Sequence, residues 1–199
     1  KEINLCCPCL EKSTLKKCDD GYICCNKRCL HSEISNAFPI INGVPILISE
    51  TNTDTVCSSV LGKEYVDRPF SHLNILRKFL IGESKITKQN CEAFLSLVLQ
   101  SNARAKVLVI GGAEKGSGTD RLWNAENVEI VSFDIYPSNT TDLVCDAHYI
   151  PIEDATFDGV WIQAVLEHVV EPSKVVGEIY RVLKTDGIVY AETPFMQQV

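Results

Sequence analysis

The stretch "VLVIGGAEKGSG", from Val107 to Gly118, constrains the fold more than any other part of the sequence. Four apolar residues lead into a loop in which four of eight residues are glycine. The apolar run over 106–110 predicts a buried strand, and residues 119–123 predict the start of a helix. A strand, a glycine loop and a helix can place backbone N–H groups against a ligand at the carboxyl edge of a sheet. We expect a nucleotide-type ligand here; a tight turn without a ligand is the alternative.

Strand and helix patterns alternate through the rest of the chain. A second strand in "VEIVSFDIYP" ends at Asp134, a third in "TDLVCDAHYIPI" reaches Asp146, and a fourth covers 160–162. "EPSKVVGEIYRVLKTDG" predicts an amphipathic helix with Gly187 just past its end, and "GIVYAETP" predicts a fifth strand. The apolar stripe of that helix comprises Val175, Val176, Ile179, Val182 and Leu183. This alternation predicts an α/β fold with a doubly wound, mainly parallel sheet.

Seven of the ten cysteines lie between Cys6 and Cys29. Cys6-x-x-Cys9 forms one close pair, and a second pair ends at Cys29 and begins at Cys24 or Cys25, of which we prefer Cys24. Two such pairs on two turns suit tetrahedral zinc, and four thiolates leave no open position for catalysis. We therefore expect a structural zinc held by Cys6, Cys9, Cys24 and Cys29. Free or oxidised thiols are the alternative.

The apolar segment "FPIINGVPILI", residues 38–48, contains the hairpin signal Asn42-Gly43. Together with the cysteines, it resembles the zinc-ribbon-like family that includes the activator subunit of several tRNA and translation-factor methyltransferases. That family has a Cys-Pro-x-Cys turn, a second cysteine pair and a Phe-Pro-Ile-x-x-Gly-x-Pro-x-Leu tail. Here Pro8 follows Cys7, one position late. A module of residues 1–50 is too small to be stabilised by its own hydrophobic core alone, so we expect a bound metal to contribute to its stability.

Residues 51–105 are expected to form a linker and two covering helices. "SHLNILRKFLI", residues 71–81, places Leu73, Leu76, Phe79 and Leu80 on one helical face. "KQNCEAFLSLVLQSN", residues 88–102, does the same with Phe94, Leu97 and Val98. Residues 106–199 would then form the ligand-binding domain.

Charge and hydropathy exclude some classes of partner. The net charge of −7 comes entirely from residues 51–199 and argues against nonspecific binding to nucleic acid or anionic membranes. No apolar run reaches the roughly 18 residues of a membrane span. The N-terminus lacks the apolar core of a signal peptide, so we expect a cytoplasmic protein.

The run from Val107 to Pro194 resembles class I S-adenosylmethionine-dependent methyltransferases of the group with Leu-Glu-His-Val after the fourth strand. The resemblance rests on "DATFDGV" and "AVLEHVVEPSKVVGEIYRVLKTDGIVYAETP". It implies that S-adenosylmethionine is the cofactor. The resemblance places Gly111, Gly112, Ala113 and Gly116 at the methionine and ribose side of the cofactor, and Asp134 with Ile135 at the ribose. It places Asp146 and Ala147 at the adenine edge, and Gln163 and Ala164 at the sulfonium.

The sequence departs from this family in three places. Val109 occupies a position where the family often has an acid, Ala113 replaces a glycine, and the family's last two strands have no counterpart, so we expect a C-terminally incomplete sheet. A catalytically weak or inactive methyltransferase-like scaffold is therefore the alternative function. A nicotinamide-dependent oxidoreductase is a weaker one, because the loop does not spell Gly-x-Gly-x-x-Gly.

Methyl transfer from a sulfonium is a direct displacement, and the cofactor carries the reactive group. A base helps when the acceptor is a hydroxyl or an amine that must lose a proton. His148, which follows Asp146, is the first candidate for a catalytic base; a structural histidine in the cofactor pocket is the alternative. The sequence does not identify the methyl acceptor or the oligomeric state.

Overall fold

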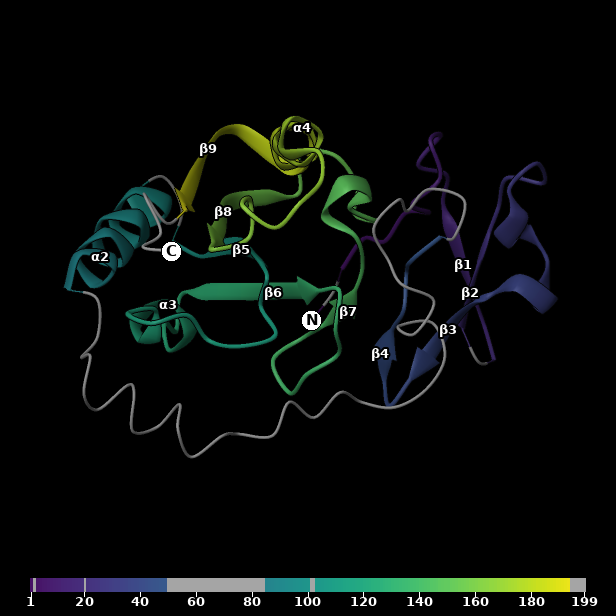
Figure 1. The fold of residues 1–199 in the computed structure, drawn as a ribbon, viewed down its shortest axis with the longest axis horizontal. Coiled ribbons are helices and arrows are strands. Elements are labelled where there is room, and N and C mark those ends of the chain that lie inside the picture. The colour runs from purple at the N-terminus through teal and green to yellow at the C-terminus, as the bar shows by residue number, and fades with distance from the viewer. Residues whose placement is uncertain (2, 20, 50–84, 101–102, 194–199) are drawn as a thin grey trace.

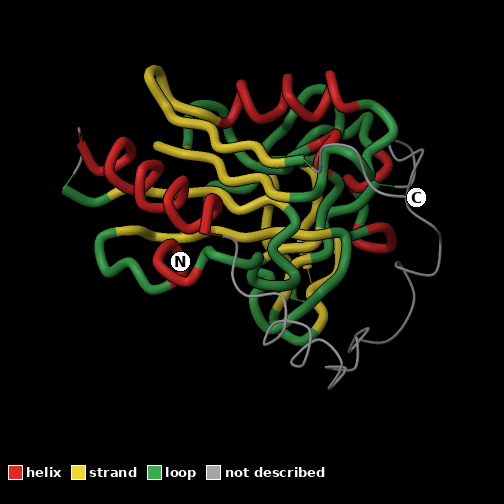
Figure 2. Tube along the Cα trace, turned by 60° about the vertical axis from the view of Figure 1, so that its left-hand side comes forward, coloured by secondary structure: helices red, strands yellow, loops and turns green. Residues whose placement is uncertain are grey.

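A computed structural model describes residues 1, 3–19, 21–49, 85–100 and 103–193. The expected linker over 51–70 and the expected helix over 71–81 lie outside these residues. The larger part of the described chain is a five-stranded parallel sheet with the order β7-β6-β5-β8-β9 (Figures 1 and 2). Its strands are β5 (Ala105–Ile110), β6 (Val128–Asp134), β7 (Leu143–Val144), β8 (Phe157–Gln163) and β9 (Leu183–Glu192). This is the Rossmann-like order of a doubly wound sheet, so the predicted fold class is confirmed.

Helices cover both faces of this sheet. On one face lie α2 (Lys85–Gln100) and α3 (Asp120–Trp123), and on the other lie α4 (Pro172–Val182) and the 3₁₀ turn η3 (Ala147–Tyr149). Strand β5 is buried on both sides, because Val107 and Val109 pack with the α2 side while Leu108 and Ile110 pack with the α4 side. None of the helices in the described ranges has the length and apolar character needed to cross a membrane.

The end of α4 differs from the sequence prediction. Val176 was expected on the buried stripe, but it is 51% exposed, while Val175, Ile179 and Val182 are buried. Gly187 does not cap the helix, because α4 ends at Val182 and β9 begins at the next residue. A register shift between Phe157↔Leu183 and Gly159↔Ile188 accommodates extra residues in β9, which is where Gly187 lies.

The N-terminal residues form a small antiparallel sheet beside the large one. Its order is β1-β2-β3-β4, and two short 3₁₀ turns precede β3. The elements are β1 (Leu15–Cys18), β2 (Gly21–Cys24), η1 (Leu30–Ser32), η2 (Ile34–Asn36), β3 (Phe38–Ile41) and β4 (Val44–Pro45). Asn42 and Gly43, with φ values of 52° and 83°, connect β3 to β4, which confirms the predicted hairpin. We call residues 1–49 the N-terminal module.

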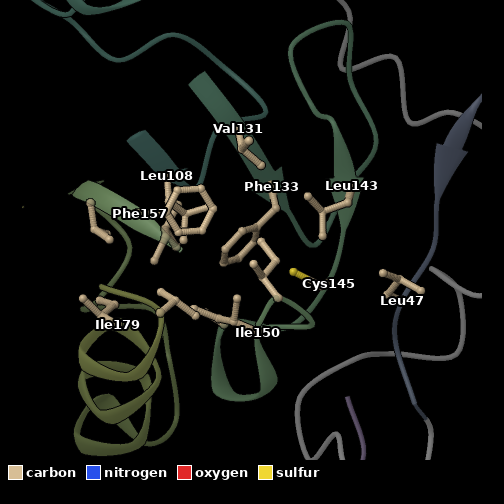
Figure 3. Packing of buried hydrophobic residues seen from close by; sticks show 14 of the residues in the cluster. Leu47, Leu108, Val131, Phe133, Leu143, Cys145, Ile150, Phe157 and Ile179 are labelled. Carbon is tan, nitrogen blue, oxygen red and sulfur yellow. The ribbon is translucent and has the colours of Figure 1, made fainter. Parts of the chain in front are cut away.

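The N-terminal module continues the large sheet beyond β7. Ile46 forms a parallel bridge with Val144, and the Leu47 backbone N–H donates to the Val144 carbonyl at 2.8 Å. On the other side, Leu5 forms an antiparallel bridge with Ile152. Leu47 is fully buried in the same apolar cluster as Leu143 and Cys145, and Figure 3 shows it on the module side of this core. The module and the sheet therefore share one hydrophobic core.

Three charged side chains lie at this junction. Lys12 Nζ donates to Glu178 Oε2 at 2.6 Å, and Arg181 Nε donates to Glu178 Oε1 at 2.8 Å. Lys12 and Arg181 also donate to the Ile150 carbonyl, at 3.2 and 2.7 Å. Burial by itself raises the pKa of the Glu178 carboxyl, but the hydrogen bonds and charges of Arg181 and Lys12 hold the net pKa below its ordinary value of 4.5. Glu178 thus ties the module to α4.

Replacing Glu178 with Gln should lower the free energy of unfolding at pH 7 by about 2 kcal/mol, because Lys12 and Arg181 lose their shared partner. The wild-type advantage is present above the ordinary carboxyl pKa and is lost as the pH falls through the lowered pKa of the folded state. Urea unfolding at pH 7 and below pH 4 should show the gap between the two proteins closing in acid. Glu126→Gln, at an exposed position, is the matched control; an equal loss in both variants would contradict this role.

Candidate functional site

A cavity of about 200 Å³ lies where the carboxyl ends of β5 and β8 meet the glycine loop. Four of the residues that the sequence assigned to a cofactor line it: Gly111, Gly116, Gln163 and Ala164. Seven lining residues were not predicted, namely Val109, Ile110, Glu114, Ser117, Thr119, Trp123 and Trp161. The position follows from the strand order. The connection from β5 to β6 passes over one face of the sheet through α3, and the connection from β7 to β8 passes over the other face through η3, which opens the sheet edge between β5 and β8.

The glycine loop is held by the strand and loop beside it. Gly111 has a φ of +79°, and a Cβ there would lie 2.4 Å from Val165 Cγ2, so the position requires glycine. The backbone N–H groups of Gly111 and Gly112 both donate to the Phe133 carbonyl, at 3.0 and 2.9 Å. Thr140 Oγ1 donates to the Gly112 carbonyl at 2.7 Å. The loop therefore keeps its shape through contacts to Phe133 of β6 and to Thr140 in the segment after β6.

Asp134 lies beside the glycine loop, at the end of β6. Its Oδ2 accepts the Ala113 backbone N–H at 3.1 Å, and its Oδ1 accepts the Tyr136 backbone N–H at 3.3 Å. Ile135, the next residue, is 36% exposed and offers an apolar surface beside the acid. Asp134 and Ala113 do not line the cavity, so the structure places the acid next to the loop but outside the hollow.

His148, the predicted catalytic base, is buried and has hydrogen-bond partners at both ring nitrogens. His148 Nδ1 lies 2.6 Å from Asp146 Oδ1, and the Glu171 backbone N–H donates to His148 Nε2 at 3.2 Å. Both ring nitrogens are therefore engaged, and the side chain is buried. Asp146 is buried too, and its Oδ1 also accepts the His148 backbone N–H at 2.8 Å. The pair, with buried Ala147 between its members, fastens η3 to the start of α4 and does not line the cavity.

The end of β8 contributes the remaining predicted residues. Ala164 has a φ of +53°, a left-handed conformation that is uncommon for a residue with a Cβ, and its backbone N–H donates to the Glu192 carbonyl at 2.8 Å. Gln163 Nε2 lies 3.4 Å from Glu192 Oε1. Glu192 also accepts from Thr87 of α2 and from the Tyr190 hydroxyl. Burial and the hydrogen bond to Glu192 raise the pKa of Tyr190 above its ordinary value of 10.

Trp161 of β8 belongs to the buried core and also lines the cavity. It is 2% exposed and stacks on Tyr190 with the ring centroids 3.9 Å apart. In the described part of the chain, its Nε1 and the Oε1 of Gln163 are the buried side-chain polar atoms without a hydrogen-bond partner. The sequence carried no signal for this, because whether a buried indole N–H has a partner depends on the tertiary packing around it.

A second candidate site lies in the N-terminal module. The sulfur atoms of Cys7, Cys9, Cys24 and Cys29 all lie within 4.8 Å of one another. Zinc–sulfur bonds of about 2.3 Å in a tetrahedron would separate the sulfurs by about 3.8 Å, and Cys7 Sγ and Cys29 Sγ are 3.8 Å apart. Burial raises the pKa of Cys24 to about 11, so a metal binding here would have to displace thiol protons.

The cluster differs from the predicted ligand set at one position. Cys9, Cys24 and Cys29 belong to both the predicted set and the observed cluster, but Cys7 replaces Cys6. Cys6 is buried at the junction, where its backbone N–H donates to the Pro151 carbonyl at 3.0 Å. Neighbouring residues of an extended segment point to opposite sides, so Cys7 faces the other three sulfurs when Cys6 faces the large sheet. Cys25, the alternative to Cys24, is exposed and outside the cluster.

Comparison with known proteins locates one family on the large sheet. Residues 112–191 match the family described as a methyltransferase domain, which is less than half of the chain. The matched stretch runs from the glycine loop to the penultimate residue of β9 and includes Gly116, Gln163 and Ala164. No curated protein matches the chain significantly.

Solved structures match about half of the chain. A candidate sarcosine dimethylglycine methyltransferase from Galdieria sulphuraria is 23% identical over 53% of this chain and 44% of its own, with a TM-score of 0.44. The PH0226 protein from Pyrococcus horikoshii is 26% identical over 54% and 59%, with a TM-score of 0.39. The trans-methyltransferase CalH, in complex with SAH, is 16% identical over 51% and 35%, with a TM-score of 0.42. The chain therefore spans less than two thirds of each of these proteins.

Replacing His148 with Ala should lower the free energy of unfolding by about 2 kcal/mol, because the buried Asp146 carboxylate loses a partner and the Glu171 N–H loses its acceptor. Urea denaturation of the purified variants would measure the change. His168→Ala is the matched control, since its side chain is 75% exposed and should change stability by less than about 0.5 kcal/mol. A His148 variant as stable as wild type would contradict the structural role.

Proposed function

We propose that the protein is an S-adenosylmethionine-dependent methyltransferase. The observation that carries this proposal is the match of residues 112–191 to a methyltransferase domain, together with the cavity at the carboxyl ends of β5 and β8. The glycine loop lacks side chains that would keep a ligand away from its backbone, and Asp134 lies beside it through its hydrogen bond to Ala113. An acid at this place can accept the ribose hydroxyls of a nucleoside. The acceptor of the methyl group is not identified by these features.

The residues of this chain would act mainly by holding and orienting the cofactor. When bound, S-adenosylmethionine supplies a methyl group on a positively charged sulfur. Asp134 would accept the ribose hydroxyls, because it lies beside the glycine loop and a carboxylate only accepts hydrogen bonds. Ile135 can cover a ring beside the acid, and Gln163 and Ala164 border the cavity where β8 ends. Such positioning, with the exclusion of water, can account for much of the rate of a direct displacement.

A catalytically inactive or weak scaffold with the same cofactor site is the second candidate function. The observation in its favour is that His148, the expected base, has both ring nitrogens engaged. An acceptor that is already nucleophilic needs no such base. The engaged histidine therefore favours acceptors of this kind and does not by itself exclude catalysis. Turnover with any acceptor, abolished by the Asp134 variant below, would reject the scaffold.

We also propose that the N-terminal module is a zinc-ribbon-like unit with a structural zinc on Cys7, Cys9, Cys24 and Cys29. The support is the spacing of the four sulfurs, which suits a tetrahedral thiolate site, and their placement on two turns. One turn is closed by the Lys12 backbone N–H on the Cys9 carbonyl at 3.0 Å, and the other by the Cys29 N–H on the Asn26 carbonyl at 2.9 Å.

Asp134→Asn should weaken binding of S-adenosylhomocysteine at least about tenfold, because the ribose hydroxyls lose a charged acceptor. Isothermal titration calorimetry on the zinc-loaded chain would measure the dissociation constants. Asp186→Asn is the matched control: Asp186 is exposed, and asparagine tolerates its φ of 61°. Equal affinity in the Asp134 variant and wild type would remove Asp134 from the site, and no binding in wild type would reject the proposed function.

Cys7→Ser should reduce bound zinc from one ion per chain to a small fraction and lower the thermal unfolding temperature, because the tetrahedral set loses a thiolate. Cys6→Ser should retain the metal, since Cys6 faces the large sheet. Metal analysis of both variants after extensive dialysis separates the two assignments. Retention of zinc by Cys7→Ser and its loss from Cys6→Ser would restore the ligand set expected from the sequence.

A further inference from the structure

A carboxylate without a cationic partner lies where β8 and β9 end. Glu192, the last residue of β9, is half-buried and is the register partner of Gln163, the last residue of β8. Figure 1 shows the tip of β9 beside α2. Among the described residues, no lysine, arginine or histidine side chain forms an ion pair with Glu192. The part of the chain that the structure describes therefore leaves this negative charge without a neutralising partner.

Neutral donors hold one oxygen of this carboxylate. Thr87 Oγ1 of α2 donates to Glu192 Oε2 at 3.0 Å, and the Tyr190 hydroxyl donates to the same oxygen. The Tyr190 hydroxyl in turn accepts from Asn90 Nδ2 at 3.4 Å. Burial, together with the hydrogen bond to Glu192, raises the pKa of Tyr190 above its ordinary value of 10, so the phenol keeps its proton and remains a donor. The two donors on Oε2 fix the orientation of the carboxylate.

The other oxygen, Oε1, faces the side chain of Gln163, which lines the cavity. Gln163 Nε2 lies 3.4 Å from Glu192 Oε1, and this long contact is the one hydrogen bond that Oε1 accepts from the described residues. A carboxylate oxygen accepts about two hydrogen bonds, so Oε1 can take a shorter and stronger one. A Cβ on Gly116 would clash with Gln163 Oε1. The amide oxygen therefore faces the glycine loop, and the amide nitrogen faces Glu192.

This arrangement suits an acceptor that becomes positively charged during methyl transfer. The sequence resemblance places the sulfonium beside Gln163 and Ala164, and the Ala164 backbone N–H donates to the Glu192 carbonyl at 2.8 Å. A neutral amine attacks the methyl carbon with its lone pair, so the N–C bond forms while the C–S bond breaks and leaves its electron pair on sulfur. The positive charge thereby moves from sulfur to the acceptor nitrogen. A carboxylate that accepts an N–H of this nitrogen stabilises the charge as it develops.

We propose that Glu192 binds the methyl acceptor and that this acceptor is an amine, whose N–H donates to Glu192 Oε1. The inference rests on the proposed function and names the substrate class for it. An amine that arrives protonated loses one proton to water before the attack, and the product leaves as the methylated ammonium ion. No base has to act during the transfer itself. This agrees with His148, whose two ring nitrogens both have partners.

The first test uses sinefungin, a cofactor analogue with C–NH₃⁺ in place of S⁺–CH₃, which puts an ammonium group where the acceptor nitrogen approaches. Calorimetry on the wild-type chain should show sinefungin binding at least about tenfold more tightly than S-adenosylhomocysteine, because a charge-assisted hydrogen bond forms to Glu192. In Glu192→Gln this preference should fall below about twofold, with the affinity for S-adenosylhomocysteine changed by less than about twofold. Glu114→Gln is the matched control: Glu114 is the charged residue that lines the cavity, and its variant should keep the preference.

A second readout does not depend on a variant folding. NMR titration of amine-labelled sinefungin in its complex with the wild-type chain should show the pKa of the ligand ammonium above that of the free ligand, because Glu192 favours the charged form. The other titratable group beside Glu192 is Tyr190, while Thr87 and Gln163 are neutral. A ligand pKa at or below the value of free sinefungin would contradict the proposal.

The acceptor class is tested by the position of the transferred methyl group. S-adenosylmethionine with a ¹³C-labelled methyl group, incubated with the chain and an extract of its source cells, should give label on nitrogen. Label only on oxygen, sulfur or carbon, or an undiminished preference for sinefungin in Glu192→Gln, would overturn the inference and leave the proposed function standing. If S-adenosylhomocysteine binds but no label is transferred, the scaffold is favoured and the inference fails. If neither S-adenosylhomocysteine nor sinefungin binds, the proposed function fails as well.

Discussion

The parallel pairing of β5 with β6 on one side and β8 on the other is the constraint on which the rest of the structure depends. Leu108 pairs with Val131 and with Val160, so β5 has no free edge and both its faces are buried. The connection from β5 to β6 and the connection from β7 to β8 then lie on opposite faces of the sheet, and the sheet edge opens where these two connections diverge. The glycine loop, Asp134 and the end of β8 meet at that opening because the topology leaves them no other place.

The N-terminal module depends on the same sheet. Its Leu47 and Phe38 belong to the apolar cluster that α4 completes with Val175 and Ile179, so the module has no separate core of comparable size. Residues 46 and 5 join the large sheet through backbone bridges to Val144 and Ile152, on either side of η3. The segment between Val144 and Ile152, which contains the Asp146–His148 pair, is therefore attached to the module at both ends. A metal in the cysteine cluster would stabilise these two attachments as well as the small sheet.

Sequence periodicity predicted the alternating strands and helices of the large sheet, because buried strands and amphipathic helices have distinct patterns, but it did not predict where α4 ends and β9 begins. It could not choose between Cys6 and Cys7, since that choice depends on which side of an extended segment faces the large sheet. The periodicity placed Val176 on the buried stripe, but Val176 is exposed. The width of the buried stripe depends on the elements that pack against α4, and the sequence of the helix does not show these. His148 was assigned to chemistry by its position after Asp146, and the sequence did not show that the two side chains pair.

Trp161 and Gln163 show how the packing behind the cavity fixes the side chains that line it. The Trp161 ring stacks on Tyr190, and the Gln163 amide lies against Glu192, so neither side chain can turn without losing these contacts. A buried donor or acceptor that stays unpaired costs about 1–3 kcal/mol. The polar groups that the cavity presents are therefore set by side chains of β9 and α2 that do not line it, because Glu192 is in turn held by Thr87.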